Sequence, residues 1–229
     1  ILGYKFKKTI KKQIIMKTPN LFLAAMLSLV LSSCNDSVAA TDLDLSTETN
    51  IEQMLQSMEF ISDPLSLSQS EKDGLILMRE EEKLAGDVYA YFYAKYALRP
   101  FTNINKSEVQ HSGAVLRLLT YFGIPDPALT EAGKFSNTDI QGLYDKLTAD
   151  GSTAEKALAV GAFIEEYDIA DLQRHLAETE NATVAKVYGN LLRGSKFHLK
   201  AFTNALKIQG ATYTPTVISV EEYNEILGN

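Results

Sequence analysis

The sequence predicts an all-α fold, a bundle of four long helices arranged as two helical hairpins that one long crossover joins. Apolar residues recur at spacings of three and four along four segments, as on the buried face of an amphipathic helix. Capping signals precede these segments, and no segment shows the alternating pattern of a half-buried strand. With 229 residues, 45% of them apolar, the chain is long enough for one such domain, which we place at residues 68–210.

The first hairpin is expected to begin at the capping box Ser68-Gln-Ser-Glu71, whose serine and glutamate can satisfy free amides at a helix start. The first helix continues to about residue 96, and its apolar positions are Leu75, Met78, Ala85, Tyr89 and Phe92. The segment 98–103 contains a proline and is expected to break the helix. The second helix then covers about 105–122.

The second hairpin follows a long crossover, residues 124–151, which carries one short amphipathic helix. A second capping box, Ser152-Thr-Ala-Glu155, opens a third helix over about 153–177. A tight turn at 178–181 separates it from a fourth helix that ends at Ile208. Two hairpins with one long crossover have the connectivity of ferritin-like four-helix bundles.

Two appendages flank the predicted bundle. Residues 34–67 are small, polar and acidic, which is typical of a tether. The tail, residues 211–229, contains a third capping box, Ser219-Val-Glu-Glu222, and is expected to form a short helix.

The N-terminal segment, residues 1–33, has the pattern of a signal peptide. It carries six lysines and no acidic residue, and its apolar run at 21–31 is too short to span a bilayer. The run ends in Leu31-Ser-Ser-Cys34, which resembles the bacterial lipobox. We therefore expect lipidation of Cys34 and an anchored protein of the cell envelope, periplasmic or on the outer surface; a free cysteine after an ordinary secretory signal is the alternative. Met16 is a second candidate start.

Composition argues against several functions. A formal net charge of −7 provides no basic surface for a phosphate backbone, so we expect no nucleic-acid partner. A single cysteine cannot form an internal disulfide. Ser195 and His198, three residues apart on one helix, lack the exposed elbow and oxyanion donors of a hydrolase.

Polar residues interrupt the apolar faces of all four helices. Glu108 and His111 share the core face of the second helix, and His198 occupies the same phase on the fourth. Such groups are costly in a core unless a partner satisfies them. The first helix offers Glu82 or its neighbour Glu81, because adjacent residues lie only about 100° apart around a helix.

An internal repeat extends this pattern to the third helix. Residues 81–88 align with 165–172 at an offset of 84, which pairs Glu82 with Glu166 and leaves Glu165 as the alternative. In helical bundles, one glutamate from each of two helices and a Glu-x-x-His motif from each of the other two bind a metal pair. Mixed oxygen and imidazole ligation suits iron or manganese, with zinc as an alternative.

At residues 78–89, 108–111, 164–172 and 191–202 the chain resembles an uncharacterised bacterial ferritin-like family, a domain of unknown function. The likeness covers about 68–225 and implies a ferritin-like bundle of di-metal ancestry, without an established activity. Ferritins and rubrerythrins also carry a tyrosine seven residues after the first glutamate. The spacing of Glu82 and Tyr89 therefore favours Glu82 over Glu81.

The fourth helix departs from that pattern, because Ser195 stands where a second Glu-x-x-His motif has its glutamate. Asp168 is a candidate for the missing oxygen ligand. The expected metal ligands are Glu82, Glu108, His111, Glu166 and His198, with Glu81, Glu165 and Asp168 as alternates and with Tyr89 and Ser195 beside them. Tyr89 and Tyr188 are expected to be core aromatics with satisfied hydroxyls, and His175 to lie on a solvated charged face.

These observations lead to three hypotheses. The first is a lipid-anchored protein that binds one or two iron or manganese ions and oxidises them with peroxide or O₂. The second is a structural or partner-binding helical lipoprotein with a degenerate site. The third is a metal-binding module without turnover.

Overall fold

The computed structural model describes residues 67–228, which form six α-helices and contain no strand. The helices are α3 (Gln69–Tyr96), α4 (Arg99–Tyr121), α5 (Thr138–Asp150), α6 (Ala154–Glu178), α7 (Ala182–Ile208) and α8 (Val220–Leu227). The predicted all-α class is confirmed. The expected signal peptide, Cys34 and all but the end of the tether lie outside the described residues. None of the helices described is long and apolar enough to cross a membrane.

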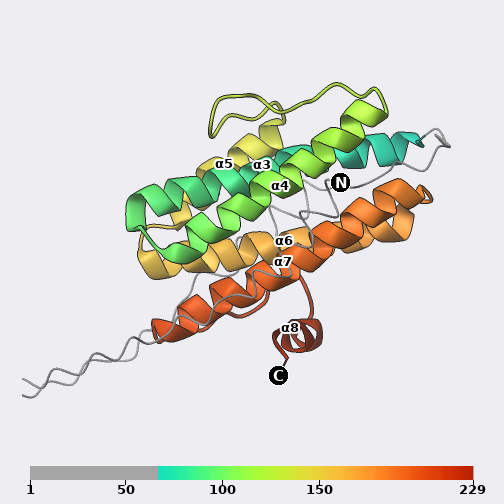
Figure 1. Cartoon of the computed structure of the whole chain (residues 1–229). Helices are drawn as coiled ribbons and strands as arrows, with labels where there is room; N and C mark the ends of the chain where they lie inside the picture. The colour runs from blue at the N-terminus through green and yellow to red at the C-terminus, as the bar shows by residue number, and fades with distance from the viewer. Residues whose placement is uncertain (1–66, 229) are drawn as a thin grey trace, which may run out of the picture. The chain divides into compact units, whose positions relative to one another are not determined.

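The four long helices form two hairpins, α3 with α4 and α6 with α7 (Figure 1). Helix α3 also contacts α6, and α4 also contacts α7, so the four helices enclose one interior. The crossover between the hairpins carries α5, which contacts α3 and α6. The short helix α8 contacts α7. The protein is therefore a helical bundle with one small helix on the crossover and one in the tail.

The first hairpin begins at the predicted capping box. The Ser68 hydroxyl accepts a hydrogen bond from the Glu71 amide, and the Glu71 carboxylate accepts one from the Ser68 amide at 2.8 Å. Only Ala97, in the left-handed conformation, and Leu98 separate α3 from α4. Helix α4 begins at Arg99 and not near residue 105, because Pro100 lies in its first turn, where a missing amide costs nothing.

Single side chains cap the other helices. Thr153, and not Ser152, is the N-cap of α6, and its side chain accepts from the Lys156 amide, so the predicted capping box with Glu155 does not form. Asn181 caps α7 by accepting hydrogen bonds from the amides of Thr183 and Val184. Ser219 caps α8, as the sequence predicts.

Apolar layers lie on both sides of the middle of the bundle. At one end the rings of Tyr89, Phe92, Phe101 and Phe202 pack together, with Tyr89 and Phe202 centroids 5.1 Å apart. Toward the other end of the bundle lie Leu75, Met78, Leu118, Leu172 and Leu191, all completely buried. The polar residues predicted in the core therefore lie between two apolar layers.

Gly161 lets α6 and α7 approach closely at the aromatic layer. A Cβ at this position would lie 2.5 Å from the Phe202 ring, which is completely buried and cannot swing away. We expect Gly161→Ala to lower the free energy of unfolding by about 1–3 kcal/mol through overpacking. Gly189→Ala on α7 is the matched control, since nothing lies within 4 Å of its added Cβ. That variant should gain about 0.5–1 kcal/mol from helix propensity, and urea titrations of both proteins should show opposite signs.

Glu71 links the start of α3 to the turn between α6 and α7. Its carboxylate accepts hydrogen bonds from the Thr179 hydroxyl at 2.6 Å and from the amides of Glu180 and Asn181 at 3.2 Å. Burial alone would raise the pKa of Glu71, but the hydrogen bonds from Thr179 and Ser68 outweigh it and lower the pKa to about 2. The carboxylate therefore stabilises the contact between the two hairpins.

This contact makes stability depend on pH. Because the folded-state pKa of Glu71 lies below the ordinary value of 4.5, its stabilising effect is complete above about pH 4.5 and is lost as the pH falls toward about 2. We expect the free energy of unfolding of Glu71→Gln to fall less steeply than that of the wild type between pH 5 and pH 2. Denaturant titrations at each pH would measure both slopes, and equal slopes would contradict the assignment.

Candidate metal centre

Helix α3 buries three consecutive glutamates, Glu80, Glu81 and Glu82, which are 2%, 3% and 1% exposed. Successive residues lie about 100° apart, so burial of all three requires partners on three sides of the helix. Glu80 accepts hydrogen bonds from the amides at the start of α5, Glu81 faces α6, and Glu82 faces α4. The sequence predicts a core position for Glu82 or Glu81, and the structure buries both of them and Glu80 as well.

The two basic residues beside these glutamates fasten the crossover. Arg79 forms an ion pair with Asp126 at 3.0 Å, and its guanidinium also donates to the Ser112 hydroxyl. Lys83 donates to the carbonyl oxygens of Glu131 and Lys134, both at 3.1 Å. The crossover is thereby held against the face of α3 that α4 and α6 leave uncovered.

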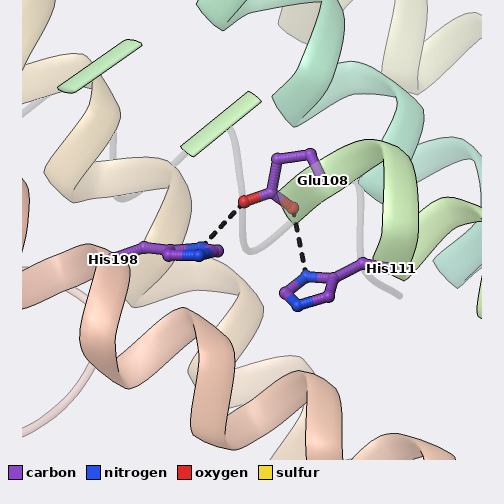
Figure 2. Close-up of side chains that lie close together, drawn as sticks. All are labelled: Glu108, His111 and His198. Atoms are coloured by element: carbon purple, nitrogen blue, oxygen red, sulfur yellow. Dashed lines mark ion pairs between the residues drawn. The ribbon is translucent and has the colours of Figure 1, made fainter. Parts of the chain in front are cut away.

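The centre of the bundle contains one carboxylate between two imidazoles (Figure 2). Glu108 Oε1 lies 2.8 Å from His198 Nδ1, and Glu108 Oε2 lies 3.3 Å from His111 Nδ1. All three side chains are at most 2% exposed. They offer ligand atoms within 4.8 Å of one another, an arrangement that could hold a metal ion. The structure thus brings together the predicted Glu108-x-x-His111 motif and His198.

Each imidazole also faces an outer carboxylate. Glu82 Oε2 lies 3.3 Å from His111 Nδ1, and Glu165 Oε2 lies 3.3 Å from His198 Nδ1. The pattern has approximate twofold symmetry, with Glu108 in the middle. Glu165, held in sequence reasoning as an alternate, thus occupies the place expected for Glu166.

Glu166 performs a different task. Its carboxylate is completely buried and accepts hydrogen bonds from the amides of Thr216 and Ile218, at 2.5 and 2.9 Å, and from the Tyr213 hydroxyl. It thereby fastens the C-terminal tail to α6 and does not join the cluster. The repeat alignment misplaced the pair by one residue, which corresponds to about 100° of rotation. No local signal could show that the tail returns to this helix.

Asp168 adds a fourth carboxylate. It lies one turn after Glu165 on α6 and is 3% exposed. Burial raises the pKa of Asp168 well above its ordinary value, and the charges of Glu82, Glu165 and Glu108 raise it further, which places its carboxylate beside theirs. Ser195 is buried too, but its hydroxyl donates to the Leu191 carbonyl of its own helix at 3.1 Å.

Comparison with known proteins identifies the family of the chain. Residues 71–229 match a family described as "Uncharacterized protein domain (DUF2202)". The chain belongs to this family. An uncharacterised protein of Methanocaldococcus jannaschii, MJ0754, is 48% identical over 165 residues, which cover 71% of this chain and 89% of the relative. The resemblance to a domain of unknown function is confirmed, although this relative comes from an archaeon and not from a bacterium.

A crystal structure of the hypothetical protein MJ0754 is also similar to this DUF2202 chain. The TM-score is 0.72 at 45% sequence identity, and the match covers 75% of this chain and 98% of the other. A solved structure therefore shares the helical bundle. Neither name assigns an activity, so the chemistry has to be argued from the site itself.

Tyrosine and glycine residues orient the ligand groups of this DUF2202 bundle. The Tyr89 hydroxyl donates to Glu165 Oε1 at 2.5 Å, as expected of a satisfied core tyrosine beside the site. A Cβ at Gly194 of α7 would lie 2.6 Å from Cε1 and Nε2 of His111. The His111 ring therefore rests its Nε2 edge on the backbone of α7 and turns Nδ1 toward the carboxylates.

Two residues beyond the cluster differ from the sequence prediction. His175 is 7% exposed and packs against Gly74 and against the Tyr188 ring at 5.6 Å, so it is not on a solvated face. The Tyr188 hydroxyl is buried and has no hydrogen-bond partner among the described residues. Both lie inside because α3, α6 and α7 meet here.

Burial and mutual attraction set the charges of the cluster. Burial raises the pKa of Glu82 to about 8, despite the nearby His111. Burial would lower the pKa of His111, but the carboxylates of Glu82 and Glu108 raise it to about 10. Burial opposes ionisation of Glu108, yet the two imidazoles hold its pKa well below the ordinary value. At pH 7, therefore, both imidazoles and the Glu82 carboxyl group are protonated in the metal-free cluster.

The pKa of His111 can be tested directly in metal-free protein. Because its folded-state pKa lies above the ordinary 6.5, the ionised imidazole stabilises the fold below that pH, and the effect is lost as the pH rises through about 10. NMR of labelled histidines should show His111 protonated at pH 8. Glu82→Gln removes one attracting charge and should lower the His111 pKa. Titration of His111 near pH 6.5 in both proteins would refute this account.

Proposed function

We propose that this DUF2202 protein is a ferritin-like bundle that binds two iron or manganese ions in its core and uses them in a peroxide- or O₂-dependent oxidation. One observation carries the proposal: the Nδ1 atoms of two buried imidazoles each face two carboxylates, and they share Glu108. Zinc is the alternative metal, because it accepts the same nitrogen and oxygen ligands.

The donor set fits a pair of divalent ions. Glu82 with His111 would hold one ion, Glu165 with His198 the other, Glu108 would bridge them, and Asp168 would supply the oxygen that Ser195 cannot. Four carboxylates carry four negative charges, which two divalent cations balance while both imidazoles are neutral. Both oxygens of Glu82 are buried without a hydrogen bond in the described part of the chain, an arrangement that a cation would relieve.

The side chains of the bundle would prepare the site for redox chemistry. Two ferrous ions would supply the two electrons that, with two protons, reduce one hydrogen peroxide to two waters. The apolar layers on either side exclude water from the ligands. The Tyr89 hydrogen bond fixes the rotamer of Glu165, and the contact with Gly194 fixes that of His111.

The proposal includes a place in the cell. Six lysines, a short apolar run and Leu31-Ser-Ser-Cys34 support a bacterial lipoprotein anchored through Cys34. The acidic segment 34–67 would then separate the bundle from the membrane surface.

Adjacent glutamates on α6 provide a matched test. Glu165→Gln should lose at least one iron per chain after anaerobic loading with Fe(II), because it removes a carboxylate beside His198. Glu166→Gln should keep the wild-type iron content of about two per chain, since its carboxylate holds only the tail. Plasma mass spectrometry measures the metal, and peroxide consumption by the loaded proteins measures turnover.

A double variant distinguishes this proposal from the hypothesis of a partner-binding scaffold with a degenerate site. Combined His111→Ala and His198→Ala should abolish metal binding and peroxide consumption. The scaffold hypothesis rests on the 2.8 Å pair of Glu108 and His198, which can satisfy itself without a metal. It predicts that the wild type holds no more metal than the double variant. Stoichiometric metal without peroxide consumption would instead indicate a binding module.

A further inference from the structure

We propose that Glu81, Asp171 and Tyr188 form a second cation site, one helical turn from the metal cluster, through which divalent ions load it. The three side chains come from α3, α6 and α7. Glu81 directly precedes Glu82, and Asp171 lies one turn after Asp168. Only the loading role of this site rests on the proposed function. The presence of the site rests on its own contacts.

The three groups are buried, and in the described residues only one of their oxygen atoms, Asp171 Oδ1, has a donor. Glu81, Asp171 and Tyr188 are 3%, 8% and 2% exposed. In the described part of the chain no hydrogen-bond donor serves either oxygen of Glu81 or Oδ2 of Asp171, and the Tyr188 hydroxyl has no hydrogen-bond partner either. Burial raises the pKa of Tyr188, and the charge of Glu81 raises it further, which places the hydroxyl near that carboxylate. Three helices thus contribute unsatisfied oxygen atoms to one interior region.

The carboxyl groups of Glu81 and Asp171 lie within hydrogen-bonding reach of each other. Two carboxylates at that distance repel unless a proton or a cation lies between them. The one basic group that pairs with them in the described residues is Arg174, whose Nη2 lies 3.2 Å from Asp171 Oδ1. Arg174 is 36% exposed and reaches only the outer oxygen, so the inner oxygens remain available.

The donor set indicates the kind of ligand. Two carboxylates and a phenolic hydroxyl are hard oxygen donors, which suit divalent iron, manganese or magnesium. The set contains no imidazole, so it should bind such ions more weakly than the central cluster. Loading requires an entry site that binds the ion more weakly than the neighbouring cluster does.

A row of carboxylates connects the second site to the cluster and to the surface. Glu165, Asp168 and Asp171 are spaced by three along α6 and therefore share one face. The charges of both Glu81 and Glu82 act on Asp168, which places it between the two sites. Glu178, at the end of α6, is 49% exposed and extends the acidic row to solvent. The negative end of the helix dipole also attracts cations there.

The test uses the full-length chain and Mn²⁺, with free Mn²⁺ followed by its paramagnetic resonance signal. The wild type should bind one weaker ion beyond those of the cluster, and the combined His111→Ala, His198→Ala variant should retain it. Glu81→Gln and Asp171→Asn, both isosteric, should each lose this ion and load the cluster roughly tenfold more slowly in stopped flow. Their final cluster occupancy should match the wild type.

Glu155→Gln is the control, because it removes one negative charge from the first turn of the same helix, at the opposite end from the acidic row. It should leave both the weaker ion and the loading rate unchanged. Unchanged binding and loading in both Glu81→Gln and Asp171→Asn, each with wild-type helix content, would overturn the inference while leaving the cluster intact. If the wild type binds the weak ion but its cluster binds no metal, the second site stands and its loading role is rejected together with the proposed function.

Discussion

The Glu108 carboxylate, held between two imidazoles, is the interaction on which the arrangement of the bundle depends. His111 lies on the same helix, but His198 comes from the other hairpin, so this carboxylate joins the hairpins at their centre. A displaced hairpin would leave buried charges without partners, at a cost of several kcal/mol. The packing contacts in the apolar layers above and below have no preferred direction, whereas the ion pairs of this polar layer fix the rotation of each helix about its axis. Packing therefore supplies the stability, and the ion pairs supply the register.

Local patterns predicted most of the fold because helices and caps are local structures. Periodicity located the four long helices, and the side chains of Ser68 and Ser219 cap helices as predicted. The start of α4 was missed because Pro100 was interpreted as a breaker, although a proline in the first turn of a helix is favourable. The choice between Ser152 and Thr153 depends on one backbone torsion, which neighbouring residues do not determine.

A site residue could be predicted from the sequence only where its spacing from another site residue fixes the helix face on which its side chain lies. Glu108 and His111 are three residues apart and must share a face, whichever way the helix turns. The C-terminal tail determines which of Glu165 and Glu166 faces the cluster, because its amides at Thr216 and Ile218 donate hydrogen bonds to Glu166. Such a contact joins residues about 50 positions apart and leaves no local signal. His175 was misplaced for a related reason, since three helices meet around it and widen the buried face of α6.

The balance of charge in the interior distinguishes a metal site from a self-satisfied ion pair. Two imidazoles need no more than two carboxylates, yet the structure buries six carboxylates in the connected region, namely Glu81, Glu82, Glu108, Glu165, Asp168 and Asp171. Protonation can neutralise the excess, and the raised pKa values of Glu82 and Asp168 are consistent with that in the metal-free protein. A core selected only for stability gains nothing from such a surplus, because apolar residues of similar volume avoid the desolvation cost. Divalent cations make the surplus useful, since each neutralises two carboxylates and releases the protons they hold.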